Sequence, residues 1–424
     1  MISGQAYGEL TLYLTLLGVA SVSCSSVNTG SAMYKGIKDF ENEKGSFLRS
    51  ALLVSLLFSA VACLLLFAFW RFFDLQAHLI IPLSLQILCD GIVAVALSSE
   101  KYSYRYKEVT LISILSSVLP AIITLALLRA VGGRFRVRVY ALLTISICLS
   151  VWATIKILKC GGRANKKMAS SLLRSALPLV PHSISSALSG QADKLIITHF
   201  LGAYALAKYS VTHSLGVALQ FAVGAVGFAL GPWMIRRLEA GDHKEISGLA
   251  GILLSGFSAL SLCLIALAPE AMKILAPAEY LDAFPALLPI ALTTPLMLLS
   301  SIITVCLVHS GKGGATVTVS IIGAALSLIL NFTLIPKLGY LGAGLSMLFS
   351  HLSSSLSGIY LLFRARLDEI LSAGKIFKTV LPTLAVGVLL FFLFEIPALR
   401  VFLLIIPAVM LLNAFYSLKG LILE

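Results

Sequence analysis

The sequence predicts an all-α integral membrane protein, on three observations. Of the 424 residues, 58% are apolar and only 12% are charged, whereas an ordinary soluble domain carries about 25% charged residues. Windows of about 20 mainly apolar residues recur along the chain, and each can cross a hydrocarbon core of about 30 Å. These runs are continuous, while the strands of a membrane β-barrel would show short alternating segments.

We expect thirteen membrane-spanning helices, arranged as two pseudo-symmetric bundles with an additional C-terminal pair. The predicted spans are residues 8–30, 50–70, 79–98, 109–129, 139–158, 175–201, 204–235, 247–269, 284–309, 314–335, 340–363, 379–398 and 400–418. They predict an N-terminal lobe of five spans (1–158), a basic cytoplasmic linker (159–174), a C-terminal lobe of six spans (175–363), and a cytoplasmic loop with two extra spans (364–424).

The net charge of +13 is best explained by the membrane and not by nucleic acid. Lysine and arginine concentrate in one set of alternate loops, beginning with 31–49, 101–107 and 156–174. Since basic residues accumulate in cytoplasmic loops, the C-terminus is predicted inside and the N-terminus outside. Four arginines at 129–138 are the exception. The outer loops are short, so no soluble domain is expected to hold a catalytic site.

Neither a metal nor a cofactor is expected. Six of the seven cysteines lie in apolar runs and none forms a CxxC pair, so they fit small packing residues. The histidines lack the spacing of metal ligands, and no P-loop or GxSxG motif is present.

Span 175–201 is the most informative segment, because it places Asp193 and Lys194 at membrane depth. A charge there costs about 2.5–3.5 kcal/mol even on a lenient scale, so it normally faces protein or water. His182, Ser186, Ser189 and Asp193 share one helix face by their spacing. This stripe indicates either a helix lining an aqueous cavity or local polar ties near the outer interface.

Three further features stand beside that stripe. Pro178 and Pro181 would each remove a backbone hydrogen bond and kink the helix, which would expose backbone carbonyls towards a cavity. Lys208 either points into the cavity or snorkels to the outer interface. Asp90, in the third span, is a cation or proton site or a hydrogen-bonded structural carboxyl.

Serines line one side of span 340–363, at positions 346, 350, 353, 354 and 357. Small polar residues at this spacing are typical of close helix packing. We expect packing here, with a ligand-binding face as the alternative.

The stretch LPLVPHSISSALSGQADKLIITHFLGAYALAKYSVTHSLG (177–216) resembles the opening of the second half of Wzx-type polysaccharide repeat-unit flippases. The matching positions are Pro178, Asp193, Lys194, Gly202, Tyr209 and Ser210. That family belongs to the superfamily that also contains multidrug and toxin extruders and the lipid II flippase. GYLGAG (339–344) resembles the start of the family's twelfth helix. The Tyr7-Gly8 step resembles its second helix, so we expect the family's first helix to be missing, through a misplaced start or a truncation.

The resemblance implies a transporter and not an enzyme. Such a protein moves an undecaprenyl-diphosphate-linked oligosaccharide across the bacterial plasma membrane by alternating access, in cell-surface polysaccharide biosynthesis. A polysaccharide polymerase and glycosyltransferases are then the expected partners. The hypothetical substrate-binding residues are Lys194, Lys208, Lys35 and His182, and the hypothetical coupling-ion or proton residues are Asp193 and Asp90.

Three alternatives compete with this interpretation. A cation-coupled multidrug antiporter would share the fold but have an acidic cavity. A membrane-embedded polysaccharide polymerase would need a sizeable outer loop, and the longest here, about 270–283, is short. A purely structural membrane scaffold would not need proline-kinked helices with buried charge.

Overall fold

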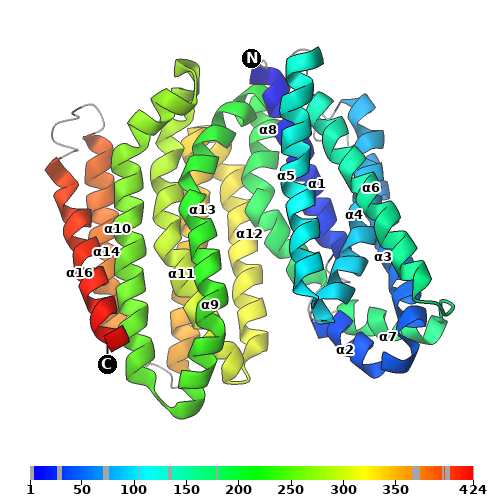
Figure 1. The fold of residues 1–424 in the computed structure, drawn as a ribbon. Coiled ribbons are helices and arrows are strands. Elements are labelled where there is room, and N and C mark those ends of the chain that lie inside the picture. The colour runs from blue at the N-terminus through cyan, green and yellow to red at the C-terminus, as the bar shows by residue number, and fades with distance from the viewer. Residues whose placement is uncertain are drawn as a thin grey trace. The chain divides into compact units, whose positions relative to one another are not determined.

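The computed structural model describes residues 4–25, 31–69, 76–103, 105–131, 136–177, 180–364, 373–393, 396 and 402–423. All regular structure in these ranges is helical, which confirms the predicted fold class (Figure 1). The chain forms two compact units, Met1–Ala207 and Lys208–Glu424. The four-part division expected from the sequence stays a prediction.

The first unit is a bundle organised around one central helix. Its long helices are α1 (Gly4–Ser25), α3 (Lys44–Phe69), α4 (Ala77–Tyr102), α5 (Tyr106–Val131) and α6 (Arg136–Lys159). Helix α4 packs against all four of the others. Its apolar window is 61% buried, against 28% or less in α3, α5 and α6, so α4 is the core of this bundle.

Two short amphipathic helices, α2 (Ser31–Asp39) and α7 (Lys166–Ala176), lie together at one end of this unit (Figure 1). Helix α7 buries Met168, Leu172 and Ala176, which recur every four residues, against α3. Asn165 begins the helix, since its side chain accepts a hydrogen bond of 2.9 Å from the backbone N–H of Lys167. The segment predicted as a linker is therefore docked on its own unit.

Helix α8 (Val180–Gly216) is interrupted at Gly202, which has φ 84° and ψ 170°. Only glycine adopts this backbone conformation readily, so the helix breaks there. The break falls between the predicted spans 175–201 and 204–235. A further bend of 44° separates α8 from α9 (Ala218–Ala240), so the second of these spans is formed by two helical pieces.

The second unit contains α9, α10 (His243–Leu275), η3 (Ala278–Ala286), α11 (Leu287–His309), α12 (Gly313–Leu338), α13 (Tyr340–Arg364), α14 (Ala373–Phe392) and α16 (Ile405–Leu423). Helix α11 packs against α9, α10, α12, α13 and α14. The span that contains it is 72% buried, so α11 is the central helix here. Both C-terminal helices, α14 and α16, pack along α10.

Within the described ranges, eight helices are long and apolar enough to cross a membrane, or nine if the bent pair counts as one span. Shorter apolar helices at Thr379–Leu390 and Ile405–Ser417 lie in α14 and α16. The protein is therefore a multi-pass membrane protein, and the exact count of thirteen is not confirmed.

A close helix contact in the first unit gives a prediction about stability. A Cβ on Gly8 would collide with the backbone carbonyl of Ala203, just after the break in α8. We expect Gly8→Leu to lower the unfolding free energy by about 1–3 kcal/mol, the usual cost of overpacking. The measurement is thermal unfolding of the purified protein in detergent.

Gly18 provides the matched control on the same helix, because a Cβ at this position would meet no other atom within 4 Å. Gly18→Leu should unfold near the wild-type temperature. Equal melting temperatures for the two variants would show that the contact between α1 and Ala203 is unimportant.

Candidate functional site

The first polar centre surrounds Asp90, within the bundle of the first unit. The Ser146 hydroxyl on α6 donates to one Asp90 carboxylate oxygen at 3.0 Å, and the Ser21 hydroxyl on α1 approaches the other at 3.3 Å. One turn earlier on α4, Gln86 accepts a hydrogen bond of 2.7 Å from the hydroxyl of Tyr13. Tyr13 is fully buried. Three helices thus meet through hydrogen bonds and not through ion pairs.

This arrangement suits two chemistries. In the first, hydroxyls of α1 and α6 donate to the two carboxylate oxygens of Asp90, and these hydrogen bonds hold α1, α4 and α6 together. The same oxygens, with serine hydroxyls beside them, are ligands of the kind that hard cations prefer. Both interpretations made from the sequence remain. Within the described residues, no group of three or more His, Cys, Asp or Glu side chains could hold a metal ion.

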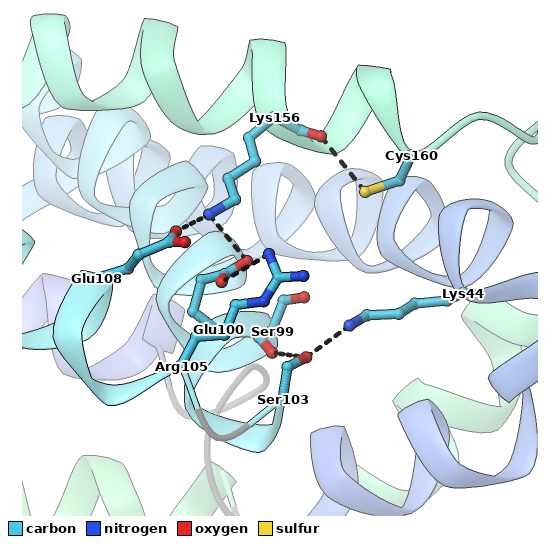
Figure 2. A network of polar contacts seen from close by, with 8 residues as sticks. All are labelled: Lys44, Ser99, Glu100, Ser103, Arg105, Glu108, Lys156 and Cys160. Carbon is cyan, nitrogen blue, oxygen red and sulfur yellow. Dashed lines mark hydrogen bonds and ion pairs between the residues drawn. The ribbon is translucent and has the colours of Figure 1, made fainter.

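A second polar centre joins the ends of α4, α5 and α6 (Figure 2). Glu100, only 5% exposed, accepts from the Lys156 ammonium at 3.1 Å and lies 3.7 Å from the Arg105 guanidinium. Lys156 also pairs with Glu108 and lies 4.9 Å from the ring centroid of Trp152. Because Glu100 is buried, the Lys156 charge offsets a desolvation cost that would otherwise destabilise the bundle.

The same network reaches α3. The Lys44 ammonium donates to the Ser103 hydroxyl at 2.6 Å, and that hydroxyl donates to the carbonyl of Ser99 at 2.7 Å (Figure 2). Sequence reasoning missed this centre. The available signal was an acidic residue, Glu100, directly after an apolar run and next to a basic loop, but its distant partner Lys156 was not apparent.

Asp193 and Lys194 are both in α8, as predicted. Asp193 is only 6% exposed, so it is buried within the protein. The Lys194 ammonium donates to the side-chain oxygen of Gln191 at 3.0 Å. Consecutive helix residues point about 100° apart, so the two charges face different surroundings.

The side chains of the other stripe residues, and of the two prolines beside the stripe, lie outside the described part of the structure. Pro178 itself falls there, as do the side chains of Pro181, His182, Ser186 and Ser189. The kink at the two prolines and the role of His182 stay predictions. In the structure, α7 ends at Ala176 and α8 begins at Val180.

The two other predicted cations have different environments. Lys208 is 12% exposed and pairs at 2.5 Å with Asp282 of η3, which is 65% exposed. Asp282 belongs to the loop predicted to be external, and a contact of this kind suits the outer-interface position. Lys35 is exposed on α2. That Lys35, Lys194 and Lys208 share one cavity stays a prediction.

Comparison with known proteins identifies the family. A model of the family described as polysaccharide biosynthesis protein matches residues 1–226, more than half of the chain. The chain belongs to this family. It is also 26% identical, over 192 residues, to an uncharacterised membrane protein of Methanocaldococcus jannaschii. That alignment covers 44% of this chain, and this chain spans about 38% of the length of that relative.

Solved structures establish the fold of this family member. It is similar to the lipid II flippase MurJ in an inward closed conformation, with a TM-score of 0.63, 15% identity, and coverage of 92% of this chain and 95% of that one. An inward-facing MATE-family multidrug resistance transporter of the MOP superfamily gives a TM-score of 0.59, 14% identity, and coverage of 86% and 96%. The chain therefore has the fold of MOP-superfamily transporters.

The Glu100 network allows a direct test of its structural role. Lys156→Met leaves the buried Glu100 carboxylate without its nearest cation. We expect a loss of about 1–3 kcal/mol of unfolding free energy, because an unpaired buried acceptor is costly while the partial exposure of Lys156 lets water screen some of the charge. Thermal unfolding in detergent measures this.

Lys159→Met is the control, since Lys159 is exposed on the same helix. It should unfold like the wild type. Adding Glu100→Gln to Lys156→Met should restore part of the lost stability, and no recovery would indicate that lost packing, and not charge, dominates.

Proposed function

We propose that this protein is a flippase for a lipid-linked oligosaccharide, moving undecaprenyl-diphosphate glycan repeat units from the inner to the outer leaflet of a bacterial plasma membrane. The observation that carries the proposal is the match of residues 1–226 to the polysaccharide biosynthesis family. The MurJ-like fold supports it, because MurJ is a lipid II flippase. The activity proposed is transport by alternating access, with the C-terminus on the cytoplasmic side.

The physical problem for such a substrate is its diphosphate. Moving an anion through a low-dielectric region costs free energy unless fixed cations accompany it. Lys194 and Lys208, both on α8, are our candidate cations. Lys35 on α2 is a candidate for the first contact with the substrate, and His182 is a candidate for a further polar contact. Asp193 and Asp90 are the candidates for coupling to an ion or proton gradient.

A flipping assay tests the cations. Reconstituted Lys194→Ala and Lys208→Ala should flip a diphosphate-linked glycan about ten- to hundredfold more slowly, because each loses a charge-assisted hydrogen bond worth about 1.5–3 kcal/mol. Lys273→Ala is the control, since Lys273 is an exposed lysine at the end of α10. Wild-type rates in both variants, at matched protein levels, would eliminate the cation-cavity hypothesis.

A substitution of Asp90 tests whether this residue couples transport to an ion gradient or only stabilises the bundle. Asp90→Asn keeps the size of the side chain and can still accept from Ser21 or Ser146, but it cannot change charge. If Asp90 couples transport, we expect flipping by the variant to lose its response to an imposed proton or sodium gradient, while its melting temperature stays within a few degrees of wild type. A preserved gradient response would assign Asp90 to structure.

A cation-coupled multidrug antiporter is the second candidate. The observation that favours it is the part-buried carboxylate of Asp90 between serine hydroxyls, which suits a cation. Reconstituted protein that exchanges an organic cation but leaves the lipid-linked glycan in place would support this function and remove the first.

A further inference from the structure

A cavity of about 190 Å³ lies within the second unit, between α11, α12 and α13. Its polar lining consists of Ser300, Thr304, Thr316, Ser320, Ser354 and His351. Methionine, isoleucine, leucine and valine side chains form the rest of the wall. At about 30 Å³ of liquid volume for each water, the space is equivalent to about six water molecules.

His351 is the unusual member of this lining. Protein surrounds the imidazole closely, yet part of the residue stays accessible because it borders the cavity. Within the part of the chain that the structure describes, His351 makes no hydrogen bond or ion pair. A buried polar ring without a protein partner needs one from elsewhere, since leaving it unsatisfied costs free energy.

Two hydroxyls of the lining, those of Thr304 and Ser320, are available as acceptors. Thr304 donates to the carbonyl of Ser300 at 2.8 Å, and Ser320 donates to that of Thr316 at 3.0 Å. Because each hydroxyl has one proton but two lone pairs, both oxygens can still accept. The cavity therefore suits a ligand that presents several O–H donors, and His351 can pair with a donor or an acceptor.

The lining carries no Asp, Glu, Lys or Arg. A charged ligand would lose its hydration there without an opposite charge in return, so a neutral ligand is favoured. The mixture of hydroxyls and aliphatic side chains matches a sugar ring, whose hydroxyls form its edge and whose C–H groups form its apolar faces. Thr304 is exposed, so the cavity opens at this residue.

From the sequence, the serines of α13 were expected to serve helix packing, with a ligand-binding face as the alternative. In the structure, some of them pack and one lines the cavity. Ser346 and Ser350 are buried and donate to carbonyls of their own helix, at 2.8 and 2.7 Å. Ser355 approaches the Leu296 carbonyl on α11 at 3.2 Å. These three stabilise packing, whereas Ser354 faces the cavity.

We propose that this cavity, lined by hydroxyls and His351, is a binding subsite for one neutral sugar ring. The proposal rests on the proposed function, because it assigns the ring to the glycan of the lipid-linked substrate. Lys312 belongs to the loop between α11 and α12, which the charge pattern predicts to be cytoplasmic. The subsite then lies in the inner half of the unit, on the side where the substrate is loaded.

The experiment is saturation-transfer NMR on the full chain in lipid nanodiscs, with free D-glucose as the neutral probe and D-glucuronate as the charged one. Wild type should show saturable binding of glucose and about tenfold weaker binding of glucuronate. His351→Leu removes the imidazole and Ser320→Leu fills the space, so each should weaken glucose binding by about tenfold or more. Thermal unfolding verifies that both variants are folded.

Thr318→Leu is the matched control, because Thr318 is exposed on α12, two residues before Ser320 and outside the lining. It should bind glucose like the wild type. Absence of saturable glucose binding in the wild type would overturn the proposal, since the cavity would then hold water only. Equal binding in the wild type and both cavity variants, or equal binding of glucuronate, would also overturn it.

A parallel flipping assay separates this subsite from the proposed function. If the wild type flips the lipid-linked glycan but the cavity variants bind glucose normally, the function stands and the subsite fails. If the wild type does not flip it, yet glucose binding is lost only in the cavity variants, the subsite stands and the function fails.

Discussion

Lipid offers no hydrogen bonds, and this constraint explains most polar contacts in the protein. Backbone groups within the bilayer must be satisfied by the chain itself, which leaves helices as the regular structure. Hydroxyl side chains follow the same rule, as Thr124 and Ser346 donate to carbonyls one turn earlier in their own helices. Lys156, near the end of α6, pairs with Glu100, and Lys208 pairs with Asp282 of η3. Asp90 and His351 differ, because they place ionisable chemistry inside a bundle.

The fold class was predictable because membrane insertion imposes a length and an apolar composition on each helix. The long spans therefore appeared as continuous runs. The short helices α2 and α7 did not, since an amphipathic helix of 9 or 11 residues leaves a weak pattern in a basic segment. The bend after Gly216 was also missed, because no proline marks it. Such details depend on helix packing, which is difficult to infer from a single sequence.

The candidate sites were predictable in position but not in partners. A charged residue within an apolar run can be recognised from the sequence, and Asp90, Asp193 and Lys194 were identified in this way. Their contacts depend on how helices rotate against one another, and the pairing of Glu100 with Lys156 could not be deduced. The family-like motif GYLGAG illustrates the difference. A Cβ on Gly342 would meet the backbone of Leu334, and one on Gly344 the backbone of Ala286, so these glycines indicate close packing and not substrate chemistry.

The break at Gly202 limits how the chain can change in length. Most connections between helices absorb insertions at little cost, because they are loops exposed to solvent. Here a single residue separates two helical segments, and the next residue, Ala203, already lies against Gly8. Each inserted residue would rotate the following segment by about 100° and carry Ala203 away from that contact. Epitope tags and length variation should therefore be tolerated far less at this position than in the exposed turn at Gly311 and Lys312.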